Sequence, residues 1–546
     1  MMETGKSEYS SQNTNGANQV YEHIPAEKFA FAQMDTEIRD TKLQTKSRGY
    51  FADAMIRFKK NKSSVVAAWI IGLLVVFAVL APVISPYNIK KDKDVVYRNF
   101  APYIESVAKL NIGIFDGAQT YSSANDLNLQ KYKGIAQETG MDPLLEITGT
   151  EVTYVMERGQ MVAKNFYKVK VNSYYRIGVV NQNVSYDTFN KIQQFQDETG
   201  LQVLYPVVEQ KDIYVKMSES EAKSVAVDAN IWYQCSDVKG TPILDKDGNF
   251  KPAYCTDIKK AGPQDQVAYH SLRIAGDDGS YVYSLAKSGS VSVRVCYYNY
   301  YQFQQWLADG EYNPPMYIFG TNELGQDLFC AIGIGARFSL LFALLVSAIN
   351  LTIGAVYGAI QGYYGGAVDM ILDRIADVLS GVPFIVVATL FQLHLAQKVG
   401  PVVSFLFAFV LTGWIGMAAL TRKQFYRFKG QEHILAARTL GASDRRLMFK
   451  HIFPNALGTI ITSCAMVIPS VISSETNLTY LGIVNLSSFT GTSIGVLMEQ
   501  GQRAMTTAPH AMFFPAIFFS LLMISFNLFG NGLRDAFNPT MRGAEG

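Results

Sequence analysis

Few residues of this chain have the types and spacing that catalysis, nucleotide binding or metal binding requires. The sequence contains no GxxxxGK[ST] phosphate loop, no HExxH zinc motif and no GxSxG nucleophile turn. Its six histidines are scattered, and its five cysteines lack the spacing of a zinc site. His394 falls within an apolar segment, but near its end, where an interfacial role is expected. The sequence therefore predicts no catalytic residue, no metal site and no cofactor bound by this chain.

The most informative segment is QEHILAARTLGASDRRLMFKHIFPNAL, residues 431–457. Small and apolar side chains gather on one face of its first part, at Ala436, Ala437, Leu440 and Gly441. Gly441 can end this first helix, and Ser443 or Asp444 can cap a second. Pro454 is expected to end that second helix before the next apolar run. A segment this short has no core of its own, so either a partner stabilises it or it is a solvated loop beside lipid phosphates.

The elements that must position this segment are apolar runs long enough to cross a membrane. A bilayer core needs about 20 apolar residues in helical form. Six uncharged runs of about that length occur, at Val65–Ile84, Phe338–Ile360, Val378–Gln397, Val399–Thr421, Asn455–Ser474 and Ala511–Leu533. Only Lys398 separates the third run from the fourth, so a tight helical hairpin is expected there, broken at Gly400 and Pro401.

Loop charge predicts the orientation of these six helices, because Lys and Arg favour the cytoplasmic side. Basic residues concentrate at 42–62 and 422–450, and the C-terminal tail adds Arg534 and Arg542. Both termini are therefore expected inside the cell, and the segment between the first two helices outside. The predicted parts are a cytoplasmic tail with a basic amphipathic segment (1–63), transmembrane helix 1 (64–85), an extracytoplasmic domain (86–319), a core with helices 2–6 (320–533) that carries the loop 422–454, and a second cytoplasmic tail (534–546).

Residues 86–319 have the patterns of a soluble α+β domain. Strict alternation of apolar and polar residues predicts strands at 167–171 and 291–296. Apolar residues at helical spacing over 189–195 predict a helix that Gly200 can end. The predicted fold class is an all-α membrane protein with this α+β domain inserted between helices 1 and 2.

Two repeated or paired features of the outside domain leave alternatives open. The tripeptide Glu-Thr-Gly recurs at 138–140 and 198–200, through either an internal duplication or chance. Cys235 and Cys255 flank a predicted turn. An extracytoplasmic location permits a disulfide between them, and two free thiols are the alternative.

The composition excludes several classes of protein. Only 17% of residues are charged, 49% are hydrophobic and the net charge is +2. A strongly basic nucleic-acid-binding protein is therefore not expected, and five cysteines in 546 residues exclude a disulfide scaffold. A low charged fraction with long apolar runs favours a membrane protein whose partners include the lipid bilayer.

The 431–457 segment resembles the EAA loop of ABC-importer permeases, which in that family forms a helix seated in a cleft of the ATPase subunit. Ala436, Ala437, Gly441 and Pro454 match the family pattern in type and spacing. Leu435 stands in place of the family's glutamate. The residues that the resemblance assigns to coupling with an ATPase are Glu432, Leu435, Ala436, Ala437, Arg438, Gly441, Ala442, Ser443, Asp444 and Pro454.

Other segments resemble the C-type permease subunit of oligopeptide and dipeptide importers. They are RFKKNK at 57–62, GTNELGQDL at 320–328, GARFSL at 335–340, GYYGG at 362–366, ETNLTYLGI at 475–483 and GLRDA at 532–536. Gln326 stands where the family usually has Arg, and Cys330 where it often has Ser. The resemblance covers about residues 50–88 and 318–543, and leaves out the extracytoplasmic domain.

This resemblance implies a non-catalytic permease subunit with the fold of type I ABC importers, in a bacterial cell membrane. It implies a second homologous permease, two ATPase subunits that bind ATP and Mg, and an extracytoplasmic peptide-binding lipoprotein. Oligopeptides are the favoured substrate, and dipeptides, nickel chelates or heme are alternatives on the same scaffold. A membrane-anchored sensor is a remote alternative. A membrane-embedded enzyme would need charged or metal-binding groups at depth, and the six runs contain no Asp, Glu, Lys or Arg.

Some polar residues near or within the runs permit two interpretations. Asp369, Asp373 and Asp377 recur every four residues, so they share one helical face that either meets a partner's basic groups or is solvated. The candidates for lining a substrate path are Asn350, Gln392, Thr462 and Asn527. Simple hydrogen bonding between helices is the alternative for these four residues.

Overall fold

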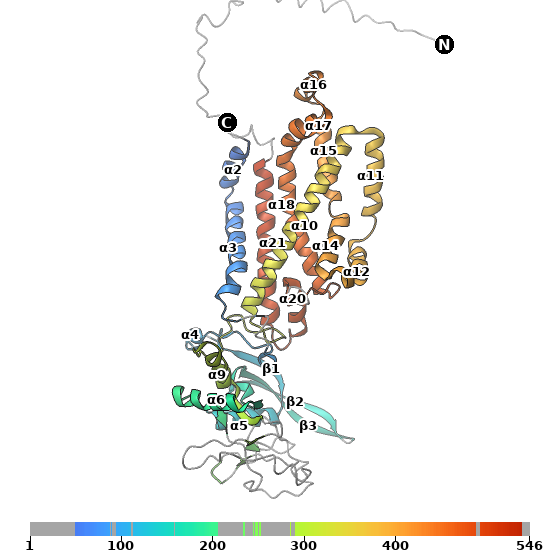
Figure 1. Cartoon of the computed structure of the whole chain (residues 1–546). Helices are drawn as coiled ribbons and strands as arrows, with labels where there is room; N and C mark the ends of the chain where they lie inside the picture. The colour runs from blue at the N-terminus through green and yellow to red at the C-terminus, as the bar shows by residue number, and fades with distance from the viewer. Residues whose placement is uncertain are drawn as a thin grey trace, which may run out of the picture. The chain divides into compact units, whose positions relative to one another are not determined.

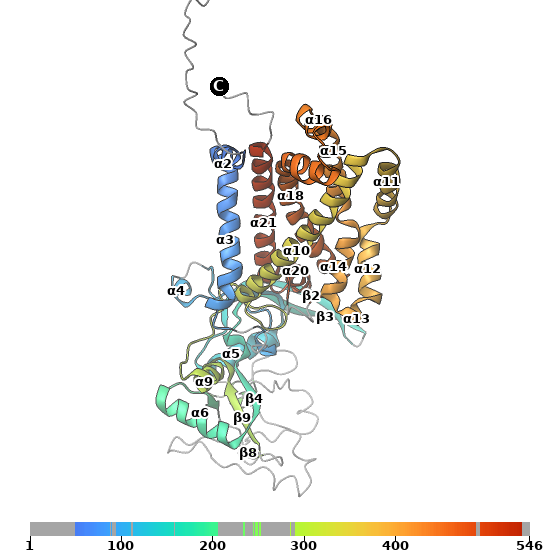
Figure 2. The same cartoon turned by 45° about the horizontal axis from the view of Figure 1, so that its top comes forward.

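The computed structural model describes residues 50–87, 89, 94–110, 113–157, 159–205, 290–486 and 492–537, with short stretches at 233–234, 244, 246–248, 251–252 and 284–285. Within these residues, five helical segments are long and apolar enough to cross a membrane: α3 (Lys62–Ile84), α10 (Leu328–Tyr364), the α14–α15 pair (Pro401–Phe428), the continuous run from α17 through α18 (Asp444–Tyr480) and α21 (His510–Phe537). Both views show α3, α21 and α18 running beside one another (Figures 1 and 2).

The third predicted span is not one straight helix, which corrects the expectation for Val378–Gln397. It is divided between α11 (Gly366–Ser380) and α12 (Phe384–His394), which are bent by 72° at the break. Pro383 lies in this break and cannot donate a backbone hydrogen bond, so the first helix cannot continue through it. The described residues therefore contain five candidate spans, or six if the bent pair is one span.

The predicted hairpin after the third run is confirmed. The short helix α13 (Ala396–Val399) ends at Gly400, whose φ of +86° favours glycine. Pro401 then begins α14 (Pro401–Thr412), where its missing N–H costs nothing. The Ser404 hydroxyl donates to the Phe391 carbonyl at 2.6 Å, so α14 returns alongside α12.

Two of the helices extend beyond the uncharged runs that predicted them and include charged residues there. Helix α10 begins at Leu328, capped by Asp327, and therefore includes Arg337. Helix α18 (Phe453–Tyr480) includes Glu475, which is completely buried. Hydrogen bonds to neighbouring side chains and carbonyls allow these two charged groups to lie in apolar helices.

Helix α10 packs closely on α15 (Ile415–Phe428) through three glycines, Gly354, Gly358 and Gly362, which recur every four residues. A Cβ atom built on Gly358 would lie 2.1 Å from the Ala418 carbonyl oxygen. Small residues at this spacing let two helix backbones approach, as is typical of helix pairs in membranes. This contact holds α15 against α10, and so it also positions the loop that follows α15.

The insert between α3 and α10 contains sheets and helices, as the alternation of residues predicts. Its elements are η2 (Val95–Tyr97), α4 (Glu105–Ala108), β1 (Ala118–Ala124), α5 (Asp126–Thr139), β2 (Leu144–Glu157), β3 (Gln160–Asn172), η3 (Tyr175–Ile177), β4 (Val179–Val184), α6 (Tyr186–Thr199), β5 (Leu204–Tyr205), β6 (Tyr233–Gln234), β7 (Lys251–Pro252), β8 (Ser284–Leu285), β9 (Val291–Cys296) and α9 (Tyr297–Asp309). The predicted strands correspond to β3 and β9, and the predicted helix to α6, which ends at Gly200.

Two parts of the insert share one topology, which supports the duplication that the Glu-Thr-Gly repeat left open. The first is β1-α5-β2-β3 with strand order β1-β3-β2, and the second is β4-α6-β5-β9 with order β4-β9-β5. In both, the last strand lies antiparallel between the other two, and in the second sheet β8 also pairs with β9. Both helices have 14 residues and end at a left-handed glycine, Gly140 and Gly200.

The register of the two units agrees where the paired strands begin, although β1 and β2 of the first unit are irregular further along. Ala118 pairs with Asn172 at the end of β3, and Val179 pairs with Cys296 at the end of β9. Leu144 pairs with Val171, and Leu204 pairs with Val295, in the same relative positions. Chance similarity of one tripeptide does not produce matched pairing across two sheets, so an internal duplication explains the insert better.

Buried aromatic and charged groups hold the insert together. Tyr97 and Tyr174 are almost fully buried, and this burial raises the pKa of both phenols well above its usual value. Arg294 of the second unit forms a 2.7 Å ion pair with Glu138 of the first, with both side chains buried. The hydroxyl of Thr321, just before α10, accepts from the Phe100 backbone N–H at 2.8 Å and thus joins the insert to the helices.

Candidate functional site

The candidate site is the 431–454 loop between α15 and α18. Helix α16 (Glu432–Thr439) is followed by Gly441 with φ +84°, whose N–H donates to the Arg438 carbonyl at 2.9 Å. The Ala442 N–H donates to the Ala437 carbonyl at 3.1 Å. Gly441 therefore ends this helix as predicted, because glycine adopts the left-handed conformation without strain.

The second predicted helix begins where expected but does not end where expected. Ser443 occupies the N-cap position of α17 (Asp444–Arg446), without a side-chain capping bond. A π-helical turn (η6, Leu447–Ile452) leads directly into α18, and Pro454 lies in the first turn of α18. The expectation that Pro454 separates the basic segment from the span is wrong, because proline is tolerated in a first turn. The segment from α17 to α18 is therefore one continuous helical run.

One side of the 431–454 loop is packed on its own chain. Ile434, Leu447 and Ile452 are fully buried, and they cluster with side chains of α10 and α15. The expectation that a separate partner must stabilise the whole segment is therefore corrected. The loop has an apolar core that it shares with the ends of two long helices, so it is held in a defined position.

The opposite side of the loop is exposed and carries most of the predicted coupling residues. Leu440 is 88% exposed and Leu435 is 45% exposed. Among the other predicted residues, the exposed ones are Glu432, Ala436, Arg438, Gly441, Ser443, Asp444 and Pro454, and the half-buried ones are Ala437 and Ala442. Two leucine side chains therefore add apolar surface to this exposed side of the loop.

A tyrosine at the end of α10 ties the loop to that helix. The Tyr363 hydroxyl donates to an Asp444 carboxylate oxygen at 2.5 Å. Arg438 of α16 donates to the same hydroxyl at 3.3 Å, and its guanidinium lies over the Tyr363 ring. This contact connects α16, α17 and α10 through one side chain, which the sequence alone did not identify.

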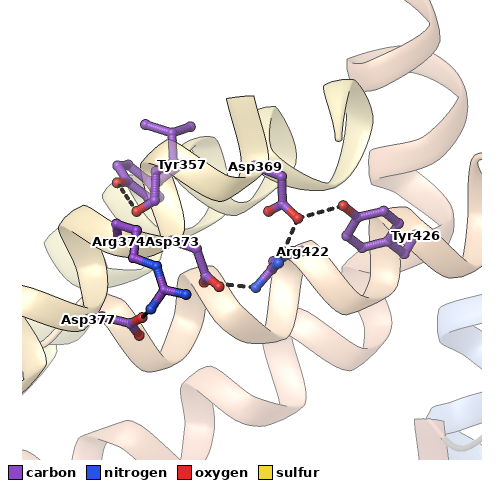
Figure 3. Close-up of polar contacts among 8 residues, drawn as sticks. Tyr357, Asp369, Asp373, Arg374, Asp377, Arg422 and Tyr426 are labelled. Atoms are coloured by element: carbon purple, nitrogen blue, oxygen red, sulfur yellow. Dashed lines mark hydrogen bonds and ion pairs between the residues drawn. The ribbon is translucent and has the colours of Figure 1, made fainter. Parts of the chain in front are cut away.

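The acidic face on α11 pairs within the chain, as Figure 3 shows, so both interpretations of Asp369 and Asp373 are corrected. Arg422 of α15 lies 2.6 Å from a carboxylate oxygen of Asp369 and 2.8 Å from one of Asp373. The Tyr426 hydroxyl donates to Asp369 at 2.7 Å. The third acid, Asp377, has the most exposed side chain of the three and pairs with Arg374. These contacts join α11 to α15.

The four candidates for a substrate path lie on four different elements. Asn350 of α10 and Thr462 of α18 are buried, Gln392 of α12 is half-buried, and Asn527 of α21 is exposed. Thr462 donates to the Thr459 carbonyl of its own helix at 2.9 Å. Their role in a path stays a prediction.

The remaining predictions concern a disulfide and the absence of a metal site. Cys235 and Cys255 lie outside the described residues, so their disulfide also stays a prediction. In the described part of the chain, no group of three or more His, Cys, Asp or Glu side chains could hold a metal ion.

Sequence reasoning missed the glycine face of α10 and the buried Glu475. The spacing of Gly354, Gly358 and Gly362 was a visible signal for close helix packing. Glu475 directly follows the fifth uncharged run, and only the observed length of α18 places it within a span. Glu475 also begins the ETNLTYLGI segment, but its hydrogen-bond partner Ser339 lies on another helix, which the sequence does not reveal.

Comparison with known proteins agrees with this arrangement. Residues 338–543 match the family model of the binding-protein-dependent transport system inner membrane component, and residues 49–102 match the N-terminal transmembrane domain of oligopeptide transport permease C. Neither model covers residues 103–337, which contain all the sheets of the insert that the structure describes.

Curated relatives are similar over about two fifths of this chain. The chain is 39% identical to the oligopeptide transport system permease protein OppC of Bacillus subtilis, over 41% of this chain and 72% of that protein. It is 37% identical to the dipeptide transport system permease protein DppC of the same species, over 41% of this chain and 69% of that protein. A MetNI methionine ABC transporter structure aligns with a TM-score of 0.32 at 14% identity, over 38% of this chain and 96% of that one.

The helices and the 431–454 loop thus define a membrane permease. This chain belongs to the family of inner membrane components of binding-protein-dependent transport systems.

Proposed function

We propose that this chain is a transmembrane permease subunit of an ATP-driven oligopeptide importer. The observation that carries the proposal is the 431–454 loop, which is packed on α10 and α15 on one side and exposes Leu440 on the other. One of two ATPase subunits binds this exposed face, and the two ATPases together supply the ATP and Mg that this chain does not bind. The exposed residues from Glu432 to Asp444, together with Pro454, form the contact.

The transport path forms between this permease and a second, homologous one. Relatives of this chain are named for oligopeptide and for dipeptide transport, which supports peptides as the substrate. Nickel chelates and heme are alternatives on the same scaffold, since an extracytoplasmic binding protein selects the substrate. A membrane-anchored sensor is the remote alternative.

The proposed orientation places both termini in the cytoplasm, and residues 86–319 outside the cell membrane. This orientation follows from the basic residues at 42–62 and 422–450, which favour the inner side. The 431–454 loop then faces the ATPases, and the insert faces the incoming substrate.

The mechanism follows from how the loop is attached. ATP-driven closure of the two ATPases pushes on α16, and Tyr363 and Asp444 pass this displacement to α10 and α18. Because α17 and α18 form one continuous helical run, α18 tilts as a unit. The bound ATP and the docked binding protein shift the equilibrium only through their different affinities for the outward-facing and inward-facing states.

The insert docks the binding protein in this proposal. Its β2–β3 ribbon supports the role, because Val152, Tyr154, Met156 and Met161 form one exposed apolar face. Met161 lies directly opposite Met156 across the two strands. Flexible methionine side chains suit a partner that must bind and leave in each cycle.

The substitution Leu440→Asp tests the proposed ATPase contact. Leu440 makes few contacts in its own chain, so the variant should fold, whereas a buried charge in the contact should weaken binding by roughly tenfold or more. Leu307→Asp, the same change at a 44% exposed leucine of α9, is the control. The assay is recovery of ATPase subunits with the tagged chain from solubilised membranes, together with peptide uptake. Equal recovery and uptake for both variants would refute the coupling role of this loop.

A further inference from the structure

Glu475 is a completely buried carboxylate near the end of α18. The Ser339 hydroxyl of α10 donates to it at 2.9 Å. The Thr476 and Thr479 hydroxyls lie at 3.4 Å and 3.5 Å, and Ser493 also hydrogen-bonds its side chain. In the described part of the chain its side-chain partners are all hydroxyls, which come from three different elements.

The third of these elements is α20 (Ile494–Arg503), whose N-cap is Ser493. The N-terminus of a helix carries a partial positive charge, which stabilises a nearby carboxylate. Packing around the carboxylate is tight, because a Cβ atom on Gly495 would lie 1.7 Å from the Thr479 hydroxyl oxygen. A Cβ atom on Gly335 of α10 would lie 2.9 Å from the Ser493 carbonyl carbon. The three elements therefore meet at Glu475 with no room to slide independently.

The opposite end of α20 contacts the segment that carries the insert. Asn322 hydrogen-bonds Gln500 at 3.4 Å, and Arg503 pairs with Glu323 at 3.3 Å. The Asn99 N–H in turn donates to the Asn322 carbonyl at 3.0 Å. Helix α20 thus joins the Glu475 carboxylate to Asn322 and Glu323. These two residues lie between the insert and α10, and they form the root of the insert.

Glu475 lies near the C-terminal end of the helical run Asp444–Tyr480, and the 431–454 loop lies at the N-terminal end of this run. Asp444 and Glu475 lie on one run, about 46 Å apart at 1.5 Å per residue. Tyr363 binds Asp444 at one end, and Ser339 binds Glu475 at the other, and both partners belong to α10. Helices α10 and α18 are therefore tied together at two levels, and the second tie also holds α20.

We infer that Glu475 is the positioning residue that makes α20 and the root of the insert follow α18 when the 431–454 loop moves. The inference rests on the proposed function, since the movement it transmits begins at the ATPases. Its consequence is that arrival of the loaded binding protein outside the membrane and ATP hydrolysis inside are coupled through one buried carboxylate.

The test compares Glu475→Gln with Ser347→Ala in the complex purified from native membranes and reconstituted in lipid nanodiscs. Glutamine keeps the size of the side chain but weakens its bonds with the hydroxyls. Ser347 is a buried residue of α10 whose hydroxyl has no hydrogen-bond partner in the described part of the chain, so its loss is a matched control. The readout is the ratio of ATP hydrolysis with binding protein and tetraalanine to hydrolysis without them.

Glu475→Gln should lower this stimulation ratio by roughly tenfold, the effect of losing one buried hydrogen bond. Basal hydrolysis and subunit recovery should stay unchanged, and Ser347→Ala should behave as the unaltered chain. Ser339→Ala should also lower the ratio, and the double variant should be no worse than Glu475→Gln alone, because both remove the same contact.

An unchanged stimulation ratio in assembled Glu475→Gln complexes would overturn the inference. If this variant does not assemble, the stimulation ratios of Ser339→Ala and Ser493→Ala test the inference instead. Each of these variants keeps the Glu475 side chain and removes one of its hydrogen-bond partners. A normal ratio in both would equally overturn it. If the unaltered chain recovers no ATPase at all, the proposed function fails, and the inference fails with it.

Discussion

The glycine contact between α10 and α15 makes a quantitative prediction about stability. The substitution Gly358→Ala adds one methyl group where the Ala418 carbonyl oxygen would lie only 2.1 Å away. An ordinary C···O contact needs about 3.3 Å or more, so the two helix backbones must separate by roughly 1 Å. The Gly354 and Gly362 contacts, which lie one turn away on either side, would loosen with it.

Two opposing terms determine the size of the effect. Overpacking a tight contact costs about 1–3 kcal/mol of the free energy of unfolding. Replacing glycine by alanine inside a helix recovers about 1 kcal/mol of helix propensity. Gly72→Ala in α3 measures the second term alone, because a Cβ atom there meets nothing within 4 Å. The difference between the two variants should therefore equal the steric cost.

The assay is unfolding of the purified chain in mixed detergent micelles by titration with sodium dodecyl sulfate, followed by loss of helical circular dichroism. Gly358→Ala should unfold at a lower denaturant fraction than Gly72→Ala, by the equivalent of about 1–3 kcal/mol. Coincident transitions for the two variants would mean that α10 and α15 are not in close contact at this position, and would refute the packing described here.

Two further predictions concern the insert. Arg294→Met should lower the free energy of unfolding of the insert by about 3–5 kcal/mol, because it leaves the Glu138 carboxylate buried without its ion-pair partner. Adding Glu138→Leu should restore most of this loss in a urea titration read by proteolysis, and a double variant as unstable as the single one would contradict the pairing. Met161→Lys should weaken capture of the extracytoplasmic binding protein by roughly tenfold, since Met161 is 62% exposed on the apolar face of the ribbon. Gln160→Lys is the control because adjacent strand residues point to opposite faces, and equal capture by both variants would exclude this docking surface.

Local features of the chain could be predicted from the sequence. The long apolar runs, the break at Gly400 and Pro401, and the end of α16 at Gly441 follow from hydropathy and from backbone conformations that few residues adopt. The same holds for β3 and β9, whose alternation is a property of single segments. The family was recognised through the 431–454 loop, because short fixed spacings along the chain identify it.

Contacts between distant segments were decided only by the tertiary structure. Arg422 neutralises Asp369 and Asp373 from another helix, so an acidic face that looked available to a partner is already paired. The face of the 431–454 loop that packs inward depends on Phe425 and Tyr363, which lie on two other helices.

The duplication in the insert shows the same division between sequence and structure. Its sequence signal was one tripeptide, whereas its structural signal is a matched register in two sheets. Glu475 likewise became a candidate only when α18 proved long enough to bury it among hydroxyls from three elements. Hydropathy and helix breaks act within a few residues along the chain, but ion pairing, burial and strand register depend on which segments the fold brings together.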